Sequence, residues 1–425
     1  MYNNKNGLPK EDRMKAYQRL IEYVKIPTAS DPDAPEDRTP STQEQWQLAY
    51  RLRDEMTVLG LTDVCLDGNC YLFGCIPGNI PDFQGYTIGF IAHLDVSPDA
   101  PSRDVEPRIV HYLGGDIVLD ADNGVVLRAA EFPQLANYYG DDLLLADGRT
   151  LLGADDKAGI AEIMTMAEIL LTHPEIKHGP IMVGFTPDEE IGRGADHFDV
   201  ARFGADFAYT VDGGPFGEIN YETFNAAAAR VRIRGRSIHP GEAKDKLINA
   251  AMVALEFDRL LPQWERPEHT ERYEGFFHLC RLTAQVEQAE LDYIVRDHDW
   301  EKLEQRLVQI KAAQTVLNEK YGAGCVEVEL KEQYRNMAAQ VLPHGHLLDT
   351  AVKAIMAQGG TPAIQPIRGG TDGSRLSYMG LPCPNLGTGS FNHHGRLEVA
   401  SVREMDQVTA CLVDIAAAYG QKERE

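Results

Sequence analysis

The chain has 425 residues, which is too long for one ordinary core and predicts two domains or one domain with a large insertion. Its formal net charge of −24 argues against nucleic acid and against an anionic membrane surface as partners, because both demand a basic protein surface. No apolar run approaches the roughly 20 residues that span a bilayer, and residues 1–13 lack the apolar core of a secretion signal. Seven cysteines without CxxC spacing predict buried thiols in a reducing, cytoplasmic compartment.

The first expected elements are helices over about 12–25 and 42–59 and a hairpin over 63–76. For the second helix, Ser41 is the expected N-cap, because Glu44 stands three residues on, as in a capping box.

An acidic run, Asp188-Glu189-Glu190, follows a short apolar stretch at 180–184 that predicts a buried strand ending at Pro187. Ligands bind at the carboxyl ends of such strands in open α/β sheets. Adjacent carboxylates repel and are costly to desolvate, so a bound cation would explain them. Taken alone, this stretch fits a solvated acidic turn equally well.

Two further predicted strands end in similar residues. The strand at 86–92 delivers His93 and Asp95, which alternation places on the same side, so that Asp95 can orient the imidazole as outer carboxylates do at zinc sites. A satisfied structural histidine is the alternative. The strand at 206–211 ends at Asp212, beside glycines that permit close backbone approach.

Asp155 and Asp156 stand at the start of a helix with an apolar face. Acids at this position also serve as N-caps, which is the simpler explanation for this pair by itself.

The pattern changes after about Tyr221. Elements expected there are strands at 226–233 and 325–330 and helices at 248–261 and 299–321. They describe a small α+β unit inserted into a larger α/β domain. The predicted domains are 1–222 and 338–425 for the α/β domain and 223–337 for the insertion. Elements expected after the insertion are a helix at 346–357, a strand at 363–366, a helix to 379, a strand at 383–386 and a helix at 402–419.

Five residues from separate parts of the α/β domain form one pattern, His93, Asp155, Glu190, Asp212 and His394. Two imidazoles and three carboxylates suffice for two zinc-like ions, each with one histidine and one carboxylate, and with the third carboxylate as a bridge. Such two-metal sites activate water and polarise a carbonyl. Glu189 lies beside a ligand and is itself free, which suits a general base.

Long strings of residues resemble the co-catalytic two-zinc exopeptidases, a family that includes carboxypeptidase G, aminoacylase and succinyl-diaminopimelate desuccinylase. The strings are 40–46, 93–99, 151–164, 185–190, 209–214, 273–276, 367–373 and 380–386. The resemblance covers nearly the whole chain from about Met14 and is greatest to the tripeptide aminopeptidases. It implies an α/β, mixed-sheet zinc-exopeptidase catalytic domain with an inserted smaller α+β lid or dimerisation domain.

The resemblance also implies roles for single residues. Asp155 becomes the bridging ligand, Glu189 the general base and Asp95 the support of His93. The last metal histidine of the family stands four residues before a glutamate, so Glu398 selects His394.

His393 occupies a position where tripeptide aminopeptidases usually have an aromatic residue, a departure that puts the pocket wall or the metal occupancy in doubt. In the inserted domain, His239 corresponds to a histidine that reaches a substrate or transition-state oxygen. Arg368 corresponds to a clamp for the substrate carboxylate, and Asn249 is expected to face the substrate. The alternatives are a backbone contact for Arg368 and an ordinary loop position for His239.

The predicted function is a metal-dependent aminopeptidase that releases the N-terminal residue of short peptides, with tripeptides implied by the resemblance. Two Zn²⁺ per subunit are expected, with Co²⁺ or Mn²⁺ as alternatives, and a homodimer through the inserted domain is an arrangement that the resemblance allows. Alternative functions are a dipeptidase, a carboxypeptidase, an N-acyl amino acid deacylase, or a non-catalytic peptide-binding protein.

Overall fold

The computed structural model describes residues 14–424, so the polar segment 1–13 lies outside the described residues. The chain divides into two compact units. The first comprises the described part of Met1–Tyr221 with Ala339–Gln365 and the described part of Thr371–Glu425. The second comprises Glu222–Ala338 and Pro366–Gly370, so it takes in a short segment that the sequence places in the catalytic domain.

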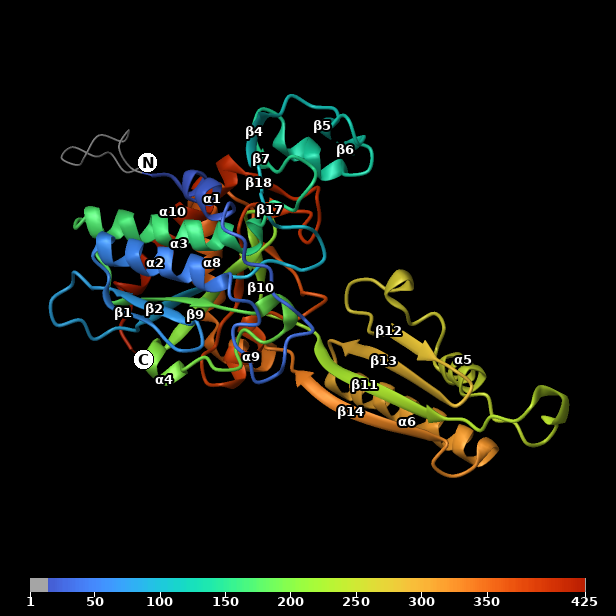
Figure 1. Ribbon diagram of the computed structural model, residues 1–425. Helices are drawn as coiled ribbons and strands as arrows, with labels where there is room; N and C mark the ends of the chain where they lie inside the picture. Colours follow the sequence, from blue (N-terminus) through green and yellow to red (C-terminus); the bar gives the residue numbers. More distant parts are fainter. Residues whose placement is uncertain (1–13, 425) are drawn as a thin grey trace. The chain divides into compact units, whose positions relative to one another are not determined.

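An eight-stranded mixed sheet forms the centre of the first unit (Figure 1). In spatial order its strands are β1 (Thr62–Leu66), β2 (Leu72–Ile76), β8 (Ile181–Thr186), β3 (Ile88–His93), β9 (Phe207–Gly213), β16 (Asn385–Gly387), β10 (Glu218–Asn220) and β15 (Ala363–Ile364). The four neighbours β8, β3, β9 and β16 run parallel. Their carboxyl ends therefore meet at one edge of the sheet, where ligands usually bind.

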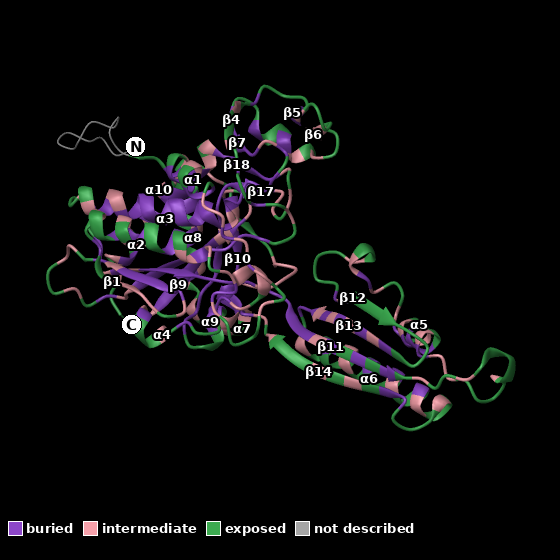
Figure 2. Ribbon diagram, in the orientation of Figure 1, coloured by how far each residue is buried: buried purple, intermediate pink, exposed green. Residues whose placement is uncertain are grey.

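Helices of the first unit pack on the large sheet or on one another. They are α1 (Ala16–Tyr23), α2 (Gln45–Leu59), α3 (Ala154–Thr172), α4 (Val200–Phe203), α7 (Ala338–Val341), α8 (His346–Ala357), α9 (Asp372–Tyr378) and α10 (Val402–Tyr419). Figure 2 shows α3 buried along most of its length, because it packs on β3 and β9 beneath α1 and α10. No helix among residues 14–424 is long and apolar enough to cross a membrane.

Two small sheets include strands from the stretch between β3 and α3, for which the sequence analysis names no helix or strand. One joins β4 (Arg108–His111) and β7 (Asp142–Leu145) to β18 (Val399–Ser401) and β17 (Ser390–Phe391). The other pairs β5 (Ile117–Asp120) with β6 (Val125–Leu127). The first of these sheets ties the β3–α3 segment to the loop that carries His394.

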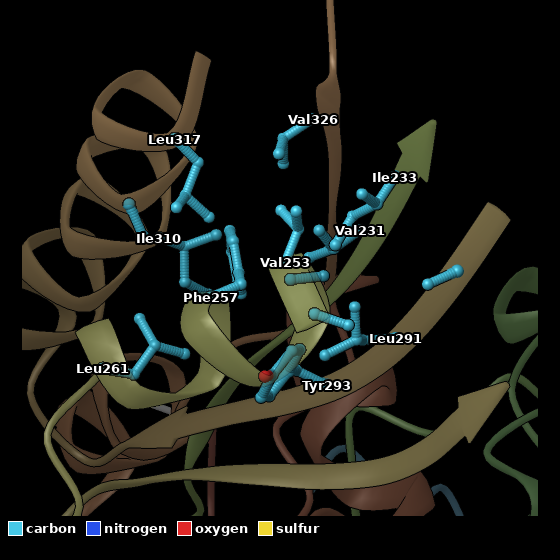
Figure 3. Close-up of a cluster of buried hydrophobic side chains, with 14 of the residues drawn as sticks. Val231, Ile233, Val253, Phe257, Leu261, Leu291, Tyr293, Ile310, Leu317 and Val326 are labelled. Carbon is cyan, nitrogen blue, oxygen red and sulfur yellow. The ribbon is translucent and has the colours of Figure 1, made fainter. Parts of the chain in front are cut away.

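The second unit is a four-stranded antiparallel sheet with two helices on one face. Its strands, in spatial order, are β12 (Phe276–Ala284), β13 (Gln288–Asp297), β11 (Asn225–Arg234) and β14 (Val326–Tyr334). Alternate residues of β11 and β13 pack against α5 (Ala250–Leu260) and α6 (Trp300–Tyr321), as Figure 3 shows for Val231, Phe257 and Ile310. This unit therefore has a hydrophobic core of its own.

The capping box predicted at Ser41 is wrong. Helix α2 begins at Gln45 with Glu44 as its N-cap residue, and no side chain caps it. The Ser41 side chain instead donates a hydrogen bond to Asp188, 147 residues away.

Candidate metal centre

Three neighbouring parallel strands deliver the polar residues of the candidate site. Strand β3 ends at His93, which lies opposite Thr186 at the end of β8. The short 3₁₀ helix η2 (Glu189–Ile191) follows β8 and carries Glu189 and Glu190. Asp212 lies near the end of β9. The structure thus brings the predicted strand exits together.

His93 forms one half of the site. Its imidazole is buried, with Nε2 3.0 Å from Asp155 Oδ1 and 3.4 Å from Asp212 Oδ1. Burial lowers the pKa of this imidazole, but the carboxylates of Asp212, Asp155 and Asp95 outweigh burial and raise the pKa well above its ordinary value.

His394 forms the other half. Its Nε2 lies 2.9 Å from Glu190 Oε2 and 3.3 Å from Asp155 Oδ2. Asp155 therefore presents one carboxylate oxygen to each imidazole, although its backbone is not helical within the bounds of α3. Each half thus contains one histidine, one terminal carboxylate and an oxygen of the shared Asp155.

The donor set fits divalent cations. Within residues 14–424, two groups of potential ligand atoms lie within 4.8 Å of one another: His93 with Asp156 and Asp212, and His93 with Asp155 and Glu190. Burial raises the pKa of Asp212 to about 6 and that of Glu190 to about 7. Glu190 Oε1 is buried and has no hydrogen-bond partner in the described chain. Crowded buried carboxylates of this kind are stabilised by a cation, and imidazole nitrogen with carboxylate oxygen suits Zn²⁺.

Asp156 belongs to one of these groups, but backbone donors already occupy its oxygens. Its Oδ2 accepts the His93 N–H at 3.0 Å and its Oδ1 accepts the Gly159 N–H at 3.2 Å. Asp156 is therefore suited to holding the ends of β3 and α3 together rather than to metal binding.

Asp95 contacts both the imidazole of His93 and the turn that carries Glu189 and Glu190. Its Oδ1 lies 3.4 Å from His93 Nδ1, and its two oxygens accept the backbone N–H groups of Glu189 at 3.0 Å and Glu190 at 3.2 Å. Burial raises the pKa of the Glu189 carboxyl well above its ordinary value, and the nearby Asp212 carboxylate raises it further.

Glu398 has a contact that its spacing from His394 did not reveal. Its buried carboxylate accepts the N–H groups of Gly153 at 2.6 Å and Asp155 at 2.9 Å, which fixes the backbone of the shared aspartate. His393 binds Ser390 Oγ through Nε2 at 2.8 Å, and its Nδ1 lies 3.6 Å from Asp155 Oδ2.

A hollow of about 350 Å³ adjoins Glu190 and His394. Its other lining residues are Pro32, Ser97, Pro98, Asp99, Ile191 and Arg193. The exposed Asp99 carboxylate lies 3.7 Å from His394 Nδ1. Arg193 donates to the carbonyls of Glu36 and Arg38, so its charge is directed at the backbone.

The three predicted substrate residues lie in the second unit and make local contacts. Asn249 caps α5 by accepting the Ala251 N–H at 3.0 Å, and His239 Nδ1 accepts the Gly241 N–H at 3.2 Å. Arg368 Nη1 donates to the carbonyls of Arg272 at 2.8 Å and Glu274 at 2.9 Å. These contacts match the backbone alternative for Arg368, and the substrate roles of all three residues stay predictions.

Sequence reasoning missed Arg296, at the end of β13. Its guanidinium lies 4.8 Å above the Tyr334 ring, and both side chains flank Ala226 across the sheet. Burial lowers the pKa of Arg296 to about 10, and within the described residues neither its Nη1 nor the Tyr334 hydroxyl has a hydrogen-bond partner. A half-buried cation whose buried Nη1 lacks a partner is suited to an anion, and a lone arginine in the sequence carries no signal of this.

Comparison with known proteins identifies the family. The model of peptidase family M20/M25/M40 matches residues 152–418. Peptidase T of Geobacillus thermodenitrificans is 49% identical over 411 residues, which cover 96% of this chain and 99% of that protein. The chain belongs to peptidase family M20/M25/M40. Within this family it belongs with peptidase T, because the match spans nearly the full length of both proteins.

Solved structures show the same fold. A tripeptidase from Staphylococcus aureus has a TM-score of 0.76 at 20% identity and covers 96% of this chain and 98% of its own. A dinuclear metal-binding M20 peptidase from Bacillus subtilis has a TM-score of 0.63 at 14% identity and covers 95% and 97%. The predicted family, fold class and enzyme class, a metallo-exopeptidase, are confirmed. A non-catalytic binding protein has no support among these relatives.

Proposed function

We propose that the chain is a tripeptide aminopeptidase that uses two zinc ions. The observation that carries this proposal is Asp155, whose two oxygens face two different imidazoles. His93 and Asp212 would hold one ion, His394 and Glu190 the other, and Asp155 would bridge them. Co²⁺ or Mn²⁺ could take the place of Zn²⁺, because the same donor types bind them.

When bound, two such ions supply an activated water and polarise the scissile carbonyl. Glu189 would take the proton of the attacking water and pass it to the leaving amine. Its backbone is held by Asp95, so its carboxyl has a defined position beside the ligand Glu190. The backbone carbonyl of Asp95 lies 3.0 Å from His93 Nδ1 and its carboxylate 3.4 Å, so Asp95 would keep that imidazole in the orientation for metal binding.

The hollow beside Glu190 and His394 would accept the N-terminal residue of the substrate. Asp99 lines it with a carboxylate that suits the positive charge of a free amino terminus. Pro32, Pro98 and Ile191 offer apolar surface to the first side chain.

A guanidinium is suited to the carboxylate at the far end of the peptide. Arg368 was the sequence-based candidate, and its guanidinium donates to backbone carbonyls. Arg296 Nη1 has no hydrogen-bond partner among the described residues, which makes Arg296 a second candidate. His239 is exposed and would be available to a substrate or transition-state oxygen.

The test compares wild-type protein with Glu189→Gln on a panel of di-, tri- and tetrapeptides, with bound metal measured on each sample. We expect tripeptide hydrolysis to fall by about 10²- to 10⁴-fold, the usual contribution of a general base, with two metals still bound. An undiminished rate, or full activity after chelation, would contradict the mechanism.

Free and N-acetylated tripeptides separate the aminopeptidase from the deacylase, because only the aminopeptidase depends on a free amine. Cleavage products separate it from a carboxypeptidase, and dipeptide hydrolysis separates it from a dipeptidase. A cytoplasmic location and a homodimer through the second unit stay predictions.

A further inference from the structure

The residue before the proposed base is buried and has an unusual backbone. Asp188 has a φ of 59°, in the left-handed region that a residue with a side chain seldom adopts, and it is fully buried. It directly precedes Glu189 and Glu190, yet its carboxylate does not belong to either potential ligand group of the described chain.

The Asp188 carboxylate is fully engaged by the segment that precedes α2. Its Oδ1 accepts hydrogen bonds from Ser41 Oγ at 2.5 Å and Gln45 Nε2 at 2.7 Å, and its Oδ2 accepts the Ser41 N–H at 2.7 Å. In return, the Asp188 N–H donates to Gln45 Oε1 at 3.2 Å. Ser41 and Gln45 are fully buried as well. We refer to these three side chains as the Asp188 network.

The acidic turn is therefore held on two sides. Asp95 accepts the N–H groups of Glu189 and Glu190, while the Asp188 network anchors the residue before them. The Asp188 carbonyl also accepts the Arg193 N–H at 2.9 Å, which closes the turn after η2. None of these contacts uses the side chain of Glu189 or Glu190.

We propose that the Asp188 network is a positioning device for the proposed base and metal ligand on the same turn. Ser41 and Gln45 fix the carboxylate of Asp188, and the fixed Asp188 backbone sets the direction in which Glu189 and Glu190 leave the turn. This inference rests on the proposed function, because it assigns what the network positions. It explains why a serine that matches a helix cap in sequence binds an aspartate far along the chain.

The test removes the hydrogen bonds one at a time, with Ser41→Ala and Gln45→Leu, and measures kcat, KM and metal affinity. Outer residues at metal sites typically change affinity or activity about 10- to 100-fold, and we expect a loss of this size in kcat and in metal affinity by chelator competition. KM should change by less than about 3-fold, because the network does not face the substrate. Ser41→Thr, which keeps the hydroxyl, should restore activity.

Ser401→Ala is the matched control, because Ser401 is another buried serine that donates to a buried aspartate, Asp141, at 2.6 Å. It should lower Tm without changing kcat or metal affinity. A change below about 2-fold in both quantities for Ser41→Ala and Gln45→Leu would overturn the proposal. The proposal would also be overturned if kcat and metal affinity fell only in proportion to the loss of Tm. If one variant does not fold, the other decides.

Failure of the proposed function has a different signature. Wild-type protein would then lack peptide hydrolysis while chelator competition still reported metal binding, and the effect of the network on Glu190 would be read from that binding alone.

Discussion

The acidic turn after β8 and the loops of the second unit hold their polar side chains in opposite ways. At the turn, Asp95 and Asp188 bind backbone or anchor the chain, which leaves Glu189 and Glu190 available for chemistry. In the second unit, Asn249 and Arg368 use their own polar atoms on local backbone groups. A polar residue at the end of a strand is therefore a good predictor of a site, because the neighbouring parallel strands fix its position. A polar residue in a loop is a poorer predictor, because nearby backbone groups compete for its hydrogen bonds.

The largest expected effect comes from Asp155, the residue that joins the two halves of the metal centre. Asp155→Ala removes an oxygen from each proposed ion, so both metals should be lost. Activity should fall by more than the roughly 100-fold that outer residues typically cost. Metal content by elemental analysis checks this directly. His111→Ala is a suitable control, since His111 pairs with Asp142 at 2.8 Å on the surface of the same unit. Two ions retained in Asp155→Ala would remove the bridging role.

Arg296 and Arg368 can be separated by a substrate that lacks the far carboxylate. A charge-assisted hydrogen bond is worth about 1.5–3 kcal/mol, so Arg296→Met should raise KM for a free tripeptide about 10- to 100-fold. KM for the corresponding tripeptide amide should hardly change. Arg368→Met should change KM for both substrates alike, because Arg368 binds the 270–274 segment and not the substrate. If instead Arg368→Met raised KM only for the free tripeptide, Arg368 would be the residue that binds the substrate carboxylate.

A smaller effect is expected at Asp99, because exposed ion pairs contribute at most about 1 kcal/mol. Asp99→Asn should lower kcat/KM for a free tripeptide by about 2- to 5-fold and leave that for a des-amino analogue unchanged. Asp33→Asn removes the same charge one residue from Pro32 and should change neither rate. Equal losses on both substrates would show that Asp99 acts through His394, which lies 3.7 Å away, and not on the amine.

The sequence predicted the parts of the molecule that depend on local pattern and strand direction. The helices at 346–357 and 402–419 lie where the apolar spacing placed them. Its errors share a physical cause. The cap predicted at Ser41 is wrong because the partner of Ser41, Asp188, is 147 residues distant. The sequence does not predict β7, because this strand pairs with β18 near the other end of the chain. Arg296 became a candidate only when the structure showed a buried donor without a partner in the described residues.

Substitution of Glu162 should have no effect on activity. This carboxyl of α3 is buried like those of the metal centre, but it belongs to neither potential ligand group of the described residues. Glu162 is fully buried, burial raises its pKa well above the ordinary value, and among the described residues neither carboxyl oxygen has a hydrogen-bond partner. The folded state therefore binds a proton that the unfolded state releases near pH 4.5. Stability therefore falls as pH rises from there toward the raised pKa.

Glu162→Gln should abolish this loss. The variant and the wild type should have similar free energies of unfolding near pH 4.5, and the variant should be the more stable at pH 8, as measured by urea unfolding at both values. Glu168→Gln on the same helix provides the opposite case, because it breaks an ion pair with buried Arg19 at 2.7 Å and should destabilise the protein. Comparison at matched metal concentration cancels the pH dependence of metal binding. If Glu162→Gln is less stable than wild type at pH 8, then Glu162 is not the uncompensated carboxyl that its surroundings indicate. The cost of burying its charge would then be offset by favourable interactions, as the cost at the metal centre would be by bound cations.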